Sequence, residues 1–227
     1  MTEQAFDGVR VVELAQWVFV PVAGALLADW GADVIHIEPT EGDPYRGLAS
    51  QGIGTDHGGV NLSLALANRG KRSIALDIQN EDGQAVLHRL LESADVFLTN
   101  MRPKALRRLG LDAEALAVRD PSLVCAMGNG YGVRGPDADR PGYDATAFWA
   151  RGGMAHMLSP PEREYPIGQR GALGDRNAAL ALAFGVAGAL LKRSRTGKGS
   201  VVDVSLLSTA IWTLSSDVLA ALGGDAP

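Results

Sequence analysis

Apolar runs alternate with amphipathic stretches over the first 130 residues of the chain. Residues 9–15 (VRVVELA) and 33–39 (DVIHIEP) are short, apolar and bounded by polar residues, which predicts two buried strands. The segment between them, residues 21–31 (PVAGALLADWG), predicts a helix, because proline suits a first helical turn and glycine suits a carboxyl-terminal cap. The pattern therefore predicts a strand–helix–strand unit.

A second unit of the same kind follows a polar, glycine-rich loop over residues 40–59. A strand is expected at 73–77 (SIALD), a helix at 81–93 and a strand at 95–99 (DVFLT). Beyond them the pattern predicts short helices over 103–110 and 112–120 and a strand over 123–130. Four to five strands that alternate with helices indicate an α/β fold with an open, mostly parallel sheet flanked by helices.

The last 100 residues do not continue the regular alternation of strands and helices. Residues 130–172 hold most of the remaining prolines and many glycines, so we expect an irregular surface segment, where sites of α/β proteins are often built. A long helix is predicted from about residue 175 to 193, then a short strand at 200–205 and a last helix from 206 to about 222.

The composition of the 227 residues, 46% hydrophobic and 21% charged, is typical of a soluble globular protein with one sizeable core. The longest apolar run, 178–191, has fourteen residues, fewer than the roughly twenty that cross a bilayer, and no charged and apolar leader opens the chain. We therefore expect a cytoplasmic protein with no membrane partner. The net charge of −5 argues against nucleic acid as a partner, because phosphate binding normally requires a basic excess.

Several classes of chemistry lack their sequence signatures. No GxGxxG follows the first strand, and GxxxxGK[ST], HExxH and GxSxG are missing, so hydride transfer, phosphoryl transfer and serine hydrolysis lose support. The single cysteine, Cys125, permits no internal disulfide, and we expect it in a buried strand. The histidines lack metal-ligand spacing, so no metal is expected; they are His36, His57, His88 and His156.

The most informative segment is residues 171–212, where Asp175 stands as a lone carboxylate between glycines and a strongly apolar helix. A basic turn, Lys192 to Lys198, closes that helix. One interpretation is purely structural, since aspartate is a favoured helix N-cap and cations complement the carboxyl end of a helix. The other is that a carboxylate presented to a cleft by a rigid helix is a nucleophile. The residues alone leave both interpretations open.

The chain resembles the class III CoA-transferases, the formyl-CoA transferase-like family. The resemblance lies in the GD before a small-residue helix, the SRTGKG turn and the VDVSLL strand. It also lies in the opening residues 8–39 and in the NRGKRSIALD and TNMRPKALRRLGL stretches, so that it spans the whole chain in order. It implies a Rossmann-like, CoA-binding large domain over residues 1–227, its amino-terminal portion. Full-length relatives are near twice this length, so a small second domain and a returning carboxyl-terminal segment are expected to be absent.

The resemblance implies that Asp175 is the nucleophile, which attacks an acyl-CoA thioester to give a mixed anhydride and then an aspartyl-CoA thioester. CoA and acyl-CoA are then substrates, a carboxylic acid is the other substrate, and no tightly bound cofactor is expected. The implied CoA contacts are Trp17, Val18 and Phe19 after the first strand, then Lys71, Arg72, Asn100, Met101, Arg108 and Arg140. Pro39 stands where the family often has an arginine, so one contact of that kind is missing.

Two alternatives to CoA transfer stay open. Tyr143 and Asp144 fall where the related α-methylacyl-CoA racemases carry a His-Asp pair, but a tyrosine with an ordinary pKa near 10 is a poor base at neutral pH. We expect Tyr143 and Asp144 in the acyl pocket instead, which makes an acyl-CoA racemase or isomerase the weaker reading. The second alternative is a non-catalytic or partner-dependent CoA-binding subunit. A homodimer or a hetero-oligomer with a related subunit is expected, and nothing identifies the acyl donor or acceptor.

Overall fold

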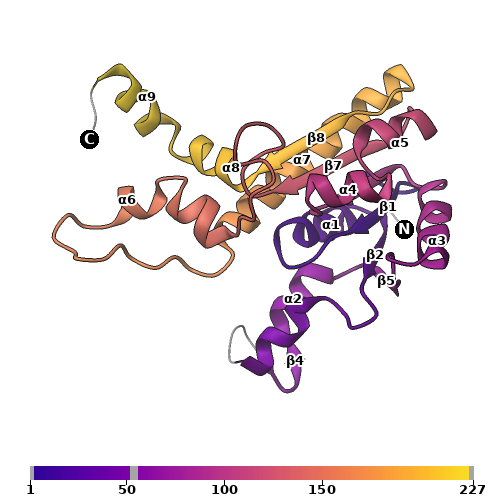
Figure 1. The fold of residues 1–227 in the computed structure, drawn as a ribbon, viewed down its shortest axis with the longest axis horizontal. Helices are drawn as coiled ribbons and strands as arrows, with labels where there is room; N and C mark the ends of the chain where they lie inside the picture. The colour runs from indigo at the N-terminus through magenta and orange to yellow at the C-terminus, as the bar shows by residue number, and fades with distance from the viewer. Residues whose placement is uncertain (1–2, 52–55, 225–227) are drawn as a thin grey trace.

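A single sheet of six strands organises the chain, in the order β5-β2-β1-β6-β7-β8, with every neighbouring pair parallel (Figure 1). The computed structural model describes residues 3–51 and 56–224. The strands are β1 (Arg10–Leu14), β2 (Asp33–Glu38), β5 (Arg72–Ala75), β6 (Val96–Thr99), β7 (Val124–Asn129) and β8 (Val201–Ser205). The predicted Rossmann-like α/β fold is confirmed, and the six strands of the sheet lie where strands were predicted, with β8 at the strand predicted for 200–205.

Helices cover both faces of the sheet, because successive strand residues point to opposite sides. Val11 packs with α1 (Phe19–Asp29) and α7 (Leu173–Thr196) on one face. Its neighbour Val12 packs on the other face, in a cluster supplied by α3 (Glu81–Leu91), α4 (Pro103–Leu109) and α5 (Ala113–Arg119). Cys125 is buried in β7, as predicted.

Three segments differ from the sequence expectations. The region of the predicted 40–59 loop contains η1 (Pro44–Gln51) and leads through β3 (Asp56–His57) and β4 (Val60–Asn61) to α2 (Leu62–Asn68); residues 52–55 of that loop lie outside the described part. The segment 130–172, expected to be irregular, contains η2 (Asp144–Ala150), a π-helix, and α6 (Met154–Leu158). The single last helix is two helices, α8 (Leu206–Thr213) and α9 (Ser215–Gly223).

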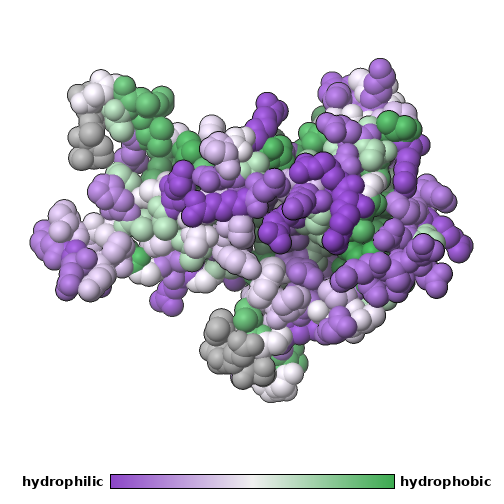
Figure 2. Space-filling view, in the orientation of Figure 1, coloured by the Kyte–Doolittle hydropathy of each residue, from purple (hydrophilic) through white to green (hydrophobic). Residues whose placement is uncertain are grey.

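The carboxyl-terminal helices carry exposed apolar side chains. In Figure 2 green side chains gather over α9, at the upper left, and Trp212, Leu219 and Leu222 are 79%, 69% and 81% exposed. None of the described helices is by itself long and apolar enough to cross a membrane; α8 and α9 reach that length and apolarity only as a pair, bent by 74°. These side chains therefore form a surface that the described residues leave uncovered.

A buried ion pair lies between the sheet and α1. The Lys71 ammonium donates to Glu13 Oε1 at 2.7 Å, to Glu13 Oε2 at 2.9 Å and to the Pro21 carbonyl at 2.7 Å. His36 Nδ1 lies 2.7 Å from Glu13 Oε1. The Lys71 and Glu13 side chains are 1% and 0% exposed, and Gly24 of α1 leaves room for the carboxylate, since a Cβ there would overlap it. Burial lowers the pKa of Lys71, and the adjacent Glu13 charge opposes that shift.

Replacing Lys71 by methionine should lower the free energy of unfolding by about 3–5 kcal/mol, because Glu13 would be left as an uncompensated buried charge. Urea denaturation followed by circular dichroism measures this loss. The matched control is Arg69→Met, two residues before Lys71 in the chain. It removes an exposed ion pair with Asp29 and should lower the free energy of unfolding by less than about 1 kcal/mol. Equal losses in the two variants would contradict the role given to Lys71.

Candidate active site

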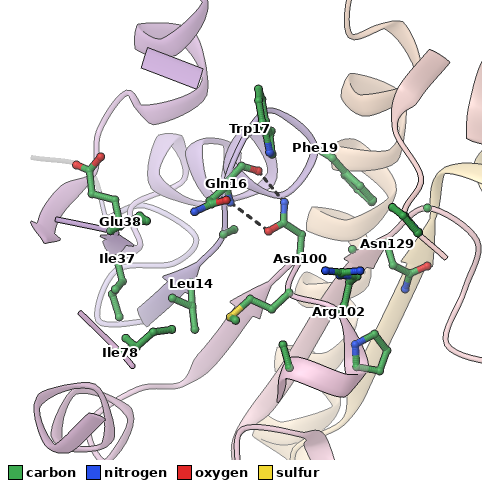
Figure 3. A pocket seen from close by; sticks show the side chains of 18 of the residues that line it. Leu14, Gln16, Trp17, Phe19, Ile37, Glu38, Ile78, Asn100, Arg102 and Asn129 are labelled. Carbon is green, nitrogen blue, oxygen red and sulfur yellow. Dashed lines mark hydrogen bonds between the residues drawn. The ribbon is translucent and has the colours of Figure 1, made fainter. Parts of the chain in front are cut away.

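A cleft of about 830 Å³ opens at the edge of the sheet where the parallel strands end (Figure 3). Its lining includes the residues that follow β1, β2, β5, β6 and β7, together with Leu206 after β8. Ligands of open α/β sheets bind outside the carboxyl ends of the strands, so the cleft lies where this architecture places a site. Apolar walls come from Leu14, Ile37, Ile78 and Phe19.

The loop between β1 and α1 is held in place from β6. Asn100, directly after β6, accepts the Gln16 N–H through Oδ1 at 3.1 Å and donates from Nδ2 to the Gln16 carbonyl at 2.6 Å (Figure 3). This two-point contact fixes the backbone next to Trp17. The Asn100 amide thus orients the wall of the cleft, in addition to lining it.

Three arginines line the cleft, and each is exposed at its rim. They are Arg102 and Arg108, at the two ends of α4, and Arg140 in the loop before η2. Arg140 lies 3.6 Å from Asp137 and over the ring of Tyr131, whereas Arg102 and Arg108 form no ion pair within the described part of the chain. Exposed guanidinium groups at the rim of a cleft are suited to the phosphates of a ligand.

Asp175 lies in the wall of the cleft as the third residue of α7, a helix of 24 residues. The helix begins after Ala172, which has a left-handed backbone (φ 58°) and provides no side-chain cap. Of the two interpretations of Asp175, the N-cap is therefore the wrong one: Asp175 lies within the first turn of the helix, with its carboxylate in the cleft lining. A carboxylate on a rigid helix is held in one geometry, as a nucleophile requires.

Asp144 supplies the cap that Ala172 lacks. Its Oδ1 accepts the backbone N–H of Gly174 at 3.1 Å, and its Oδ2 is buried without a partner in the described part of the structure. The approach is close because Gly174 has no side chain: a Cβ there would overlap Asp144 and Phe148. Asp175 is thus not a lone carboxylate, since the carboxylate of Asp144 from η2 packs against the first turn of α7.

The two carboxyl groups perturb one another. Burial and the nearby charge of Asp144 raise the pKa of Asp175 to about 7, against a small opposing effect of Arg176. Burial raises the pKa of Asp144 as well, although its hydrogen bond from Gly174 opposes the change. Asp175 therefore has both protonation states available near neutral pH, and its ionised form is more basic than an ordinary carboxylate.

The cleft brings together eight of the twelve residues that the sequence analysis selected. Those that line it are Trp17, Phe19, Asn100, Met101, Arg108, Arg140, Tyr143 and Asp175. The other four lie elsewhere. Val18 is buried in the core at the start of α1 and Lys71 in the interior beside Glu13. Arg72 pairs with Asp33 at the amino end of the strands, on the opposite edge, and Asp144 lies behind the first turn of α7.

Several lining residues were not selected from the sequence. Among them are Gln16, Arg102, Gly128 to Gly130 and the residues 76–79 after β5. The signal for most of them was present, because they lie at or just after the carboxyl end of a predicted strand. Arg102 lies in the basic stretch 102–108, of which only Arg108 was expected to contact CoA.

The model of CoA-transferase family III matches residues 6–226, nearly the whole chain. The chain belongs to this family. Within it, the cinnamoyl-CoA:phenyllactate CoA-transferase of Clostridium sporogenes is 45% identical over 95% of this chain and 52% of its own length. The (R)-2-hydroxy-4-methylpentanoate CoA-transferase of Clostridioides difficile is 37% identical over 96% of this chain and 55% of its own length.

A solved structure of a CAIB/BAIF family protein from Brucella suis superimposes with a TM-score of 0.90 at 34% identity. It covers 100% of this chain and 60% of the Brucella chain. The family III chain described here thus spans about half the length of the curated relatives it matches.

Asp175→Asn should stabilise the chain at high pH and not at low pH. The pKa of about 7 in the folded chain exceeds the ordinary 3.8 that applies after unfolding, so ionisation removes stability as the pH rises from about 4 to about 7. The free energy of unfolding of the variant should be about 1–2 kcal/mol higher than that of the unsubstituted chain at pH 8.5, and the two should be equal at pH 4. The difference is smaller than the full pKa shift would give, because Asp175 is only half-buried and solvent screens its charge.

Urea denaturation at several pH values measures the difference. Asp217→Asn, which changes an aspartate in the first turn of α9, is the control for loss of a helix-start charge. A stability difference that does not change with pH would contradict the raised pKa of Asp175.

Proposed function

We propose that this chain carries the CoA-binding cleft and the nucleophile of a CoA-transferase, which moves CoA from an acyl-CoA thioester to a carboxylic acid through a covalent intermediate on Asp175. The observation that carries the proposal is the half-buried Asp175 carboxylate in the wall of the strand-end cleft, on the first turn of a 24-residue helix. Membership of CoA-transferase family III supports the same reaction.

Covalent catalysis divides one CoA exchange into successive acyl-transfer steps, at the donor carbonyl and at the carbonyl of Asp175. An ionised Asp175 oxygen attacks the thioester carbon, the carbon–sulfur bond breaks, and CoA leaves as the thiolate, which gives an acyl-aspartyl anhydride. The thiolate attacks the Asp175 carbonyl, releases the donor acid and forms an aspartyl-CoA thioester. The acceptor carboxylate then repeats these steps in reverse. The raised pKa of Asp175 supports its role, because a more basic carboxylate is the better nucleophile once it is ionised.

We assign the phosphates of CoA to the arginines at the rim, Arg102, Arg108 and Arg140, and its pantetheine arm to the wall formed by Trp17, Phe19 and Met101. The Asn100 side chain contributes mainly through the loop that it holds. Lys71 and Arg72 are not part of this assignment, since the first is sealed in the interior and the second lies at the opposite edge of the sheet.

An acyl-CoA racemase fits the site less well. Tyr143 is 61% exposed and packs edge-on against Trp17, with ring centroids 6.1 Å apart, and Asp144 is engaged with the start of α7. This arrangement supports a wall of the acyl pocket more than a proton-transfer pair. The names of both relatives specify CoA transfer.

For the acceptor we propose a 2-hydroxy acid with a bulky apolar side chain. Phenyllactate and 2-hydroxy-4-methylpentanoate, in the names of the two relatives, share that chemistry. The aromatic ring of Tyr143 in the cleft lining offers apolar contact area for such a side chain.

A further protein segment or subunit is expected to contact this chain. Phe184 of α7 is 79% exposed and adds to the apolar side chains left uncovered on α8 and α9. Large exposed apolar surfaces mark contact sites. This supports the predicted homodimer or hetero-oligomer and keeps open a site completed by another chain.

Asp175→Asn should abolish CoA exchange and leave the dissociation constant of CoA within about threefold, because the substitution removes the nucleophile and keeps the shape of the cleft. Exchange between an acyl-CoA and phenyllactate, followed by liquid chromatography, measures turnover, and titration calorimetry measures CoA binding. Asp217→Asn is the control and should retain both properties. Retained turnover in Asp175→Asn would refute the nucleophile. An unsubstituted chain that binds CoA without turnover would instead favour the partner-dependent binding subunit.

A further inference from the structure

The backbone of Trp17 adopts a conformation that tryptophan rarely takes. Its φ is 70°, and Ala172 at the start of α7 is the other non-glycine residue with a positive φ within residues 3–51 and 56–224. This left-handed region is unfavourable for a residue with a Cβ, so surrounding contacts must offset the free-energy cost of the conformation. Backbone conformations of this kind concentrate at functional sites, and Trp17 lines the cleft.

The compensating contact comes from Asp43. The Trp17 N–H points at its carboxylate, 3.3 Å from Oδ1 and 3.2 Å from Oδ2, and Oδ1 also accepts the Tyr45 N–H at 2.8 Å. Asp43 is 2% exposed, so these backbone N–H groups replace water as hydrogen-bond donors to its buried carboxylate. Hydrogen bonds from two N–H groups to one buried carboxylate are strong and directional.

Asp43 is itself held from β2. Its own N–H donates to Glu38 Oε2 at 2.9 Å, and Glu38 is fixed by Arg46 at 2.8 and 2.7 Å and by the Ser73 hydroxyl at 2.8 Å. The Arg46 guanidinium lowers the pKa of Glu38 to about 2, so this anchor stays ionised. The backbone of the β1–α1 loop is therefore hydrogen-bonded on both sides, to Asn100 after β6 and to Asp43 after β2.

These hydrogen bonds determine where the indole of Trp17 lies. The Trp17 ring stands between Tyr45, with centroids 6.4 Å apart, and Tyr143, with centroids 6.1 Å apart, both in edge contacts. Tyr45 belongs to η1 and Tyr143 precedes η2, so Trp17 joins two distant segments at the cleft. A rotation about the Trp17 backbone would move the ring out of this stack.

We propose that Asp43 is a positioning residue: it holds Trp17 in the left-handed conformation and so sets the indole as a fixed wall of the cleft. What the cleft binds rests on the proposed function, whereas the positioning of Trp17 does not.

The test labels the chain with 5-fluorotryptophan, which gives one fluorine NMR resonance for each of the four tryptophans. The resonance of Trp17 is assigned by its loss in Trp17→Phe. In Asp43→Asn the side chain keeps one acceptor oxygen for the Tyr45 N–H and places an NH₂ group where Oδ2 faces the Trp17 N–H, so the Trp17 resonance should shift or split while those of Trp30, Trp149 and Trp212 stay in place. An unmoved Trp17 resonance in folded Asp43→Asn would overturn the proposal.

Asp120→Asn is the matched control. Asp120 accepts the N–H two residues on, from Ser122 at 2.8 Å, as Asp43 does from Tyr45, but it precedes β7 at the opposite edge of the sheet. It should leave all four resonances unchanged. A Trp17 resonance that moved equally in Asp120→Asn would show a general response to destabilisation and would also count against the proposal.

A stability cycle covers the case in which Asp43→Asn folds poorly. Asp43→Asn should raise the unfolding equilibrium constant by about tenfold in the unsubstituted chain and by less than about threefold in Trp17→Gly, because glycine adopts a positive φ without strain. Equal effects in both backgrounds, or failure of the double variant to fold, would overturn the proposal.

CoA binding adds a readout in the cleft itself. The dissociation constant of CoA should rise by about tenfold in Asp43→Asn and by less than about twofold in Asp120→Asn. An unsubstituted chain that binds no CoA would refute the proposed function, and the fluorine resonances would still decide the role of Asp43.

Discussion

Parallel pairing of β1 with both β2 and β6 brings their carboxyl ends to one edge of the sheet, and the loops that follow them meet there. The remaining parallel strands add their own ends to the same edge, so a cleft forms where the helices diverge. The β1–α1 loop occupies the centre of this edge. It is therefore within reach of side chains from both neighbouring strand ends, Asn100 and Asp43, which hold its backbone.

The electrostatics of the site follow from where charge is buried. Glu13 and Lys71 neutralise one another beneath α1, far enough inside that Lys71 does not serve the cleft. At the start of α7, by contrast, Asp144 and Asp175 are two carboxyl groups with few cations nearby, and burial raises the pKa of each. Asp144 is occupied by the backbone of Gly174, which leaves Asp175 as the carboxylate that faces the cleft.

Local periodicity was sufficient to predict most of the fold. The first strand–helix–strand unit, α3 to α5, and α7 appear within a few residues of their predicted bounds, since each has a clear apolar pattern and cap residues. Contacts between distant positions were not readable in this way. Lys71 was expected to contact CoA, but its partner is Glu13, 58 residues away, and the cap of α7 comes from Asp144, 30 residues before Gly174. The division of the last helix into α8 and α9 lacks a proline or glycine at Leu214 to signal it.

The central claim is that Asp175 becomes covalently acylated. Incubating the chain with a panel of acyl-CoAs and then with hydroxylamine, which converts an activated carboxyl group to a hydroxamate, tests it by intact-protein and peptide mass spectrometry. The account predicts a hydroxamate confined to the peptide that contains Asp175 and dependent on the acyl-CoA. Turnover of acyl-CoA with no hydroxamate at Asp175, or a hydroxamate at another carboxyl group, would contradict it.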